Sequence, residues 1–161
     1  MKKEYQDNLI AKFPEFFTDL QEDQKIHTGE NVKEIINELT NQESIVMPIQ
    51  FGFECGDGWY WLLYEIMDTI YNYCNWNKVE IPKVLQIKEK YGALNFYFVG
   101  GNETVRGMVW FAEHLSRNIC ETCGTNKNVG STRGWIYTIC EKCLEKNPRA
   151  KELEWVPNKS V

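Results

Sequence analysis

The sequence predicts an α+β fold, in which amphipathic helices pack on a small antiparallel sheet and a four-cysteine ribbon follows at the C-terminal end. Three observations predict this fold class. Apolar residues recur at helical spacing over residues 59–75 and again over residues 103–118. Residues 84–99 alternate apolar and polar side chains around a glycine, which is typical of a β-hairpin. Four cysteines occur as two pairs between residues 120 and 143.

The N-terminal part of the chain is predicted to be largely helical. Apolar residues follow a helical pattern over residues 5–26, and Pro14 interrupts it, so we expect two short helical pieces there. Residues 31–40 carry a second amphipathic stripe, and residues 45–54 are rich in β-branched and aromatic residues and are expected to be extended.

A Gly56-Asp57-Gly58 turn precedes the 59–75 helix, and we expect Asp57 to cap the N-terminus of that helix. The chain is then divided into four parts that form one compact unit. These are an N-terminal helical segment (1–43), an α+β core (44–118), a ribbon (119–146) and a charged tail (147–161). The tail is expected to fray, although its apolar residues Leu153 and Trp155 are candidates for docking.

The four paired cysteines predict a metal site. Cys120 and Cys123 form one Cys-x-x-Cys knuckle and Cys140 and Cys143 form another, with 16 residues between the two knuckles. This spacing lets four sulfurs converge on one tetrahedral ion, and an iron–sulfur cluster, a redox pair and disulfides are the alternatives. The spacing and the reducing environment expected for this chain favour zinc as the cofactor. Four thiolates leave no open position for water, so we expect the zinc to be structural.

Composition and charge argue against some classes of binding partner. The net charge is −5, and only residues 103–161 contain more bases than acids, so long nucleic acid is not favoured as a partner. No stretch reaches the roughly 20 apolar residues of a membrane span, and the polar start does not resemble a signal peptide. We therefore expect a cytoplasmic protein with no membrane partner. Aromatic residues make up 14% of the chain, which suggests that some line a pocket or lie at the surface.

Three segments together resemble a known group of proteins. They are Phe53-Glu-Cys-Gly-Asp-Gly-Trp-Tyr60, Lys88-Glu-Lys-Tyr-Gly-Ala-Leu-Asn-Phe-Tyr97, and a Cys-x-x-Cys-Gly ribbon that follows an amphipathic helix. Over roughly residues 45–145 the chain resembles a family of small, largely uncharacterised phage and prophage proteins. The resemblance implies a phage protein acting in the host cytoplasm, where such proteins often blunt defence by sequestering nucleotide immune signals. Asn95 departs from the pattern, because many relatives are expected to have a basic residue there.

Three functions from different classes follow. The first is an anti-defence sponge that holds a small nucleotide-like ligand without cleaving it, with helix N-terminal amides and cations for phosphates and aromatic rings for a base. The expected ligand-binding residues are Asp57, Trp59, Trp61, Lys88, Lys90, Tyr97, Arg106 and Arg133. The second is a zinc-ribbon interaction module that docks on a host protein or nucleic acid. The third is a small hydrolase that uses Glu54, Asp57 and Glu89, although no nucleophile motif accompanies these acids.

Structural roles compete with these assignments. The alternative for Asp57 is a role as helix cap alone, and for Trp59 a place in the core. For Lys88 and Lys90 it is a position on a solvated strand face. The sequence also leaves a homo-oligomer possible. No catalytic residue is assigned.

Overall fold

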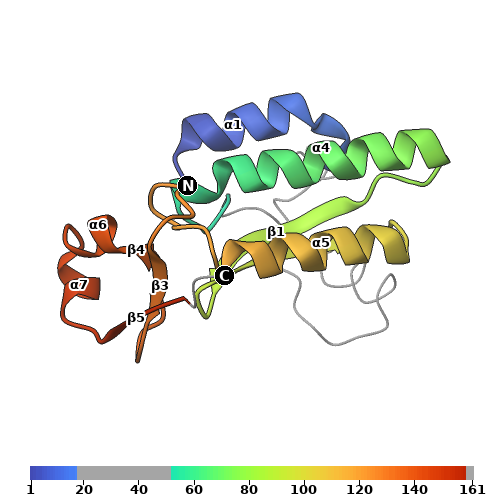
Figure 1. The fold of residues 1–161 in the computed structure, drawn as a ribbon. Coiled ribbons are helices and arrows are strands. Elements are labelled where there is room, and N and C mark those ends of the chain that lie inside the picture. The colour runs from blue at the N-terminus through green and yellow to red at the C-terminus, as the bar shows by residue number, and fades with distance from the viewer. Residues whose placement is uncertain (18–51, 159–161) are drawn as a thin grey trace, which may run out of the picture.

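The computed structural model describes residues 1–17 and 52–158 of the chain, and these form two lobes (Figure 1). The core lobe (residues 1–17 and 52–118) contains α1 (Lys3–Lys12), the 3₁₀ turns η1 (Pro14–Phe16) and η3 (Asp57–Trp59), α4 (Tyr60–Asn77), β1 (Lys83–Lys90), β2 (Ala93–Val99) and α5 (Glu103–Ser116). The ribbon lobe (residues 119–158) contains β3 (Val129–Thr132), β4 (Thr138–Cys140), α6 (Glu141–Leu144), α7 (Pro148–Lys151) and β5 (Trp155–Pro157). This mixture of helices, small antiparallel sheets and a four-cysteine cluster confirms the predicted fold class.

The helices of the core lobe follow the apolar spacing of the sequence. The expected 59–75 helix is α4, and α1 packs beside it with Pro14 ending the first helical piece (Figure 1). The expected 103–118 helix is α5, which Asn102 caps by accepting a hydrogen bond from the amide of Val105. The helix expected over residues 31–40 lies outside the described residues, and so does most of the extended segment expected over 45–54.

The hairpin forms as predicted, with one local difference. β1 and β2 are antiparallel, and both residues of the Tyr91–Gly92 turn have positive φ, as a two-residue type I′ turn requires. The register shifts between Val84 and Gln86, where β1 contains a bulge. The bulge places Val84 and Ile87, three positions apart, on the buried face, whereas strict alternation would place Leu85 there with Ile87.

Both edges of this hairpin are covered by other parts of the core lobe. On the β1 side, the amide of Glu54 donates to the Ile87 carbonyl, and the Glu89 amide donates to the Glu54 carbonyl. On the β2 side, side chains of α5 accept from the edge amides: Leu94 donates to Ser116 Oγ at 2.9 Å and Phe96 to Glu113 Oε1 at 2.8 Å. The hairpin is therefore fixed against α5 by hydrogen bonds as well as by apolar packing.

The hydrophobic core lies between the helices and the inner face of the hairpin. Its largest fully buried side chains are Leu9, Phe13, Phe16, Phe53, Trp59, Leu63, Met67, Ile70, Val84, Ile87 and Leu94. Cys55 and Cys74 are also buried, as their apolar context predicts. Burial of so many large side chains makes the core lobe the main source of hydrophobic stabilisation.

The ribbon lobe contains a three-stranded antiparallel sheet in the order β4-β3-β5. Its edge strand β5 comes from the segment that we expected to form a fraying tail, so that expectation is corrected. The physical reason is Trp155, whose indole Nε1 donates to the Ile139 carbonyl at 3.1 Å and whose ring packs on Gly130. Trp155, a candidate for docking in the sequence, thus packs on the ribbon and brings the backbone of residues 155–157 into the sheet.

Within the described residues, no helix combines the length and the apolar character that crossing a membrane demands.

Candidate metal centre and its docking site

Four cysteines of the ribbon lobe converge on one point. The Sγ atoms of Cys120, Cys123, Cys140 and Cys143 all lie within 4.8 Å of one another. The first knuckle closes with a hydrogen bond from the Gly124 amide to the Cys120 carbonyl at 2.8 Å, and Gly124 has φ +77°. The second knuckle runs from the end of β4 into α6, with Cys140 at the N-cap position. Both knuckles therefore present two sulfurs each to a shared centre.

The geometry of the cluster fits a metal ion. The Sγ atoms of Cys123 and Cys140 are 3.7 Å apart. A tetrahedral zinc ion with Zn–S bonds of about 2.3 Å requires sulfurs about 3.8 Å apart. Sulfur donors exclude ions that prefer oxygen, such as magnesium and calcium. The four cysteines could thus hold a thiophilic metal ion in a closed tetrahedron.

The charge that four ionised thiols would carry also favours a bound cation. Burial raises the pKa of Cys120, and burial together with the neighbouring sulfurs raises the pKa of Cys143. Partial burial also acts to raise the pKa of Cys123, but hydrogen bonds from the Thr125 backbone and the neighbouring thiols lower it overall. Four thiolates in such a small space repel one another, so they ionise together only when a cation compensates their charge.

The first knuckle is docked on the Gly56-Asp57-Gly58 turn of the core lobe. Glu121, which lies inside this knuckle, accepts two hydrogen bonds of 2.8 Å: its Oε1 from the Gly56 amide and its carbonyl from the Gly58 amide. A Cβ at Gly58 would lie 2.2 Å from the Cys120 carbonyl oxygen and 2.5 Å from the Gly124 amide nitrogen. The two glycines are therefore needed for close approach of two backbones.

Further hydrogen bonds hold the lobes together, including those from Asn158 Nδ2 to the Arg117 carbonyl and to Asn118 Oδ1. The indole Nε1 of Trp59 donates to the Ile119 carbonyl at 3.0 Å, directly before the first cysteine. At the other end of the ribbon sheet, Thr138 Oγ1 donates to the carbonyl of Gly92 in the hairpin turn. The 53–60 segment, the 88–97 hairpin and the ribbon thus meet where the core lobe contacts the ribbon lobe.

Two expected ligand-binding residues have structural positions instead. Trp59 has no exposed surface, so its ring cannot stack on a base in this structure. Asp57 does not cap α4: its Oδ1 accepts from the Lys2 amide at 2.7 Å and its Oδ2 pairs with Lys2 Nζ at 3.2 Å. The amides of Gly56 and Gly58 bind Glu121, so these two N–H groups are not available to an external anion. The predicted cap and the predicted stacking role of Trp59 are wrong for these reasons.

The other expected ligand-binding residues do not form one pocket with the turn. On the hairpin, Lys88 Nζ lies 5.2 Å from the ring centre of Tyr97, and Lys90 Nζ lies 5.5 Å from that of Tyr91. Trp61 is 66% exposed on α4.

Two arginines complete the set. Arg106 pairs with Glu103 along α5, and Arg133 pairs with Glu154 in the ribbon lobe. These residues are spread over both lobes, and each cation has a local partner.

The carboxylates considered for hydrolysis also have local partners. Glu54 Oε2 accepts from Gln86, Glu89 Oε1 accepts from the Gly92 amide, and Asp57 binds Lys2. These bonds hold the hairpin and the N-terminal segment in place. The hydrolase interpretation gains no support from them.

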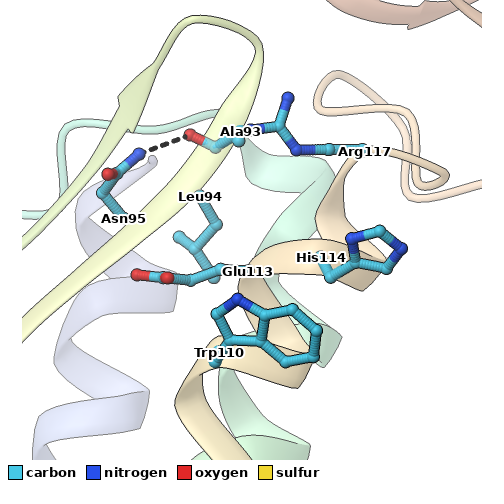
Figure 2. Close-up of a pocket in the computed structure, with 7 residues that line it drawn as sticks. All are labelled: Ala93, Leu94, Asn95, Trp110, Glu113, His114 and Arg117. Atoms are coloured by element: carbon cyan, nitrogen blue, oxygen red, sulfur yellow. Dashed lines mark hydrogen bonds between the residues drawn. The ribbon is translucent and has the colours of Figure 1, made fainter. Parts of the chain in front are cut away.

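Sequence reasoning missed a surface pocket between β2 and α5, here called the α5 pocket. It has a volume of about 180 Å³ and is lined by Ala93, Leu94, Asn95, Trp110, Glu113, His114 and Arg117 (Figure 2). Trp110 and His114 on the exposed side of α5 and Arg117 at its C-cap follow one another at helical spacing of four and three, and this spacing is a sequence signal that could have indicated them.

No family model matches this chain, and no curated protein or solved structure does either.

Proposed function

We propose that this chain is a non-catalytic binding protein in which a structural zinc ion fixes the ribbon lobe on the core lobe and thereby shapes a surface for a protein partner. The observation that carries this proposal is the position of exposed aromatic residues at the contact of the two lobes. Zinc is the metal that a closed set of four cysteines typically binds. It has no redox chemistry, and a closed site leaves no open position for catalysis.

The proposed docking surface, here called the tip cluster, consists of Lys90, Tyr91, Trp135 and Ile136. Tyr91 and Trp135 are each 71% exposed, although they are large aromatic residues. They belong to different lobes, and their neighbours Gly92 and Ile136 are in close contact. A Cβ added at Gly92 would lie only 2.7 Å from Ile136 Cγ2. Since Thr138 also bonds Gly92, the metal site and the hairpin together determine how the two rings are presented.

The chemistry of the tip cluster favours a protein partner with an acidic rim around an apolar patch. Tryptophan and tyrosine are enriched among the residues that dominate binding energy at protein interfaces. Lys90 supplies an exposed cation beside Tyr91, which complements an acidic rim. The net charge of −5 disfavours long nucleic acid as the partner.

The sponge for a nucleotide immune signal remains a prediction from the resemblance, as do the phage origin and the cytoplasmic location. Its expected pocket loses support because the Gly56–Gly58 amides bind Glu121 and Trp59 is buried. The interaction module is therefore favoured over the sponge.

Site-specific photo-crosslinking in cells of the natural source tests the proposal. A benzophenone amino acid is placed at Tyr91 and, separately, at Trp135, with Trp76 as the control because it is 82% exposed on α4. We expect one and the same protein to crosslink from positions 91 and 135 but not from position 76. A Lys90→Glu substitution should reduce both crosslinks, because it places an acid opposite the acidic rim.

Equal crosslinking from all three positions would contradict the proposal. Crosslinking only to a second copy of this chain would also contradict it, and would identify the tip cluster as a self-association surface.

A further inference from the structure

The α5 pocket brings several polar side chains and an exposed ring together between β2 and α5 (Figure 2). Two hydrogen bonds join the two elements that form it. Ser116 and Glu113 accept from the edge amides of Leu94 and Phe96, so α5 lies across the end of β2 at a fixed distance. The pocket is thus built by secondary structure rather than by loops.

Glu113 forms the wall of the pocket. Its Oε1 is held by the Phe96 amide at 2.8 Å, which fixes the orientation of the carboxylate. Burial raises the pKa of Glu113, while the Phe96 amide and the charge of Arg117 act to lower it. The group is an oriented hydrogen-bond acceptor for an N–H donor that enters the pocket.

Trp110 and His114 supply flat ring surfaces on the same side of α5. The two rings are stacked, with centroids 5.8 Å apart and an angle of 17° between their planes. Trp110 is 67% exposed, so most of its indole remains accessible. A planar heteroaromatic group can stack there, as bases do on tryptophan in nucleotide-binding proteins.

Arg117 provides the cation at the pocket rim, one helical turn from Glu113 and His114. Within residues 1–17 and 52–158, its guanidinium forms no ion pair or hydrogen bond, in contrast to Arg106 and Arg133. Its charge acts on Glu113 without a direct ion pair, so the exposed guanidinium keeps N–H donors for a phosphate, which it can bind through two parallel bonds. On the β2 side, Asn95 also lines the pocket, and its Nδ2 donates to the Ala93 carbonyl.

From this juxtaposition we infer that the α5 pocket binds a nucleoside monophosphate, with the base against Trp110, a base N–H on Glu113 and the phosphate on Arg117. The size of the pocket restricts the ligand. A volume of about 180 Å³ is below that of pockets which enclose larger ligands, about 300–1,000 Å³, so it accommodates one ring system. The inference is independent of the tip cluster and of its protein partner.

Calorimetric titration of the full, zinc-loaded chain with AMP, GMP, CMP and UMP tests this inference. Adenosine, which lacks the phosphate, and ribose 5-phosphate, which lacks the base, separate the two halves of the ligand. We expect saturable binding of at least one nucleoside monophosphate, weaker binding of adenosine and no detectable binding of ribose 5-phosphate.

Two exposed residues of the pocket are replaced, each with a matched control. Trp110→Ala should weaken the monophosphate and its nucleoside about tenfold, because both lose the stacking surface. Arg117→Gln should weaken only the monophosphate, by about two- to fivefold, and raised salt should remove this difference. The controls Trp76→Ala on α4 and Arg106→Gln on the same helix should bind as the wild type does.

The inference would be overturned if none of the four monophosphates bound. It would equally be overturned if Trp110→Ala and Arg117→Gln bound the ligand as tightly as their controls.

Discussion

The Gly56–Gly58 turn and the α5 pocket both contain N–H donors that suit an anion, but they differ in whether those donors are already bonded. At the turn, the amides of Gly56 and Gly58 donate to Glu121, and Asp57 pairs with Lys2. In the α5 pocket, the guanidinium of Arg117 and the ring of Trp110 are exposed. The turn resembled an anion site in the sequence because glycines before a helix often bind anions. Here an acid of the same chain already occupies those amides, so the turn is a docking site for the ribbon lobe.

Loss of the metal should have the largest effect. Chelation or Cys143→Ser removes a contribution on the order of 10 kcal/mol to the folding of the ribbon lobe, because metal binding and folding are coupled in such sites. Metal analysis should find one zinc ion per chain in the wild type and none in the variant. Acid should release the metal, since protons compete for the sulfurs and the pKa of Cys143 is raised by burial and its neighbouring sulfurs.

The control for this experiment is Cys74→Ser, which removes a buried thiol of the core lobe. This variant should retain one zinc ion per chain. An unchanged unfolding profile of the metal-free wild type would contradict a structural role for the metal.

The Gly58→Ala substitution should have the next largest effect. The added Cβ would overlap backbone atoms of Cys120 and Gly124, which cannot rotate away, so we expect a loss of about 3 kcal/mol in the free energy of unfolding. Gly107→Ala is the matched control, since nothing lies within 4 Å of a Cβ there and α5 gains about 0.5–1 kcal/mol from alanine. Denaturant unfolding of both variants measures the difference. A Gly58→Ala protein as stable as the wild type would show that the turn does not need close backbone approach.

Trp59→Phe should have an intermediate effect. Phenylalanine retains most of the buried ring but cannot donate to the Ile119 carbonyl, so about 2 kcal/mol of stability should be lost. Trp61→Phe on the exposed side of α4 should change stability by less than about 0.5 kcal/mol. Equal effects of the two substitutions in thermal unfolding would contradict the distinction between a docking tryptophan and a surface one.

Asp57→Asn should have the smallest effect, and it should depend on pH. Burial acts to raise the pKa of Asp57, but hydrogen bonds from Lys2 and its positive charge lower it overall. A carboxyl whose folded pKa is depressed stabilises the fold above its unfolded pKa of about 3.9, and this contribution is lost as the pH falls through the folded pKa. The stabilities of wild type and variant should therefore differ at neutral pH and converge in acid.

The control is Asp7→Asn, which removes an exposed ion pair along α1 without touching the turn. A constant difference between the Asp57→Asn variant and the wild type at all pH values would exclude the Lys2 pairing as its cause.

The sequence predicted the features that depend on the spacing of nearby residues along the chain. The helices α4 and α5 and the hairpin follow from the spacing of apolar residues, and the metal cluster follows from two knuckles at a characteristic interval. The bulge near Val84 could not be predicted, because one inserted residue changes which face is buried without changing the composition of the strand. Strand β5 was missed because its pairing depends on where Trp155 packs, which is a tertiary contact.

The role of the Gly56–Gly58 turn could not be settled from the sequence for a different physical reason. Glycine is used where an anion must approach backbone amides and also where two backbones must touch. Only the position of Glu121, which is distant in sequence, distinguishes the two uses. In the same way, the α5 pocket depends on α5 crossing the edge of β2, which periodicity within either element does not reveal.

Hydrogen exchange at the Gly56 and Gly58 amides tests most directly whether the metal site holds the ribbon lobe on the core lobe. Both amides donate to Glu121, inside the first knuckle, whereas the Leu94 amide donates to Ser116 within the core lobe. With zinc bound, all three amides should be protected. After chelation, we expect Gly56 and Gly58 to exchange rapidly while Leu94 stays protected. Protection of Gly56 and Gly58 that survives chelation would contradict the account.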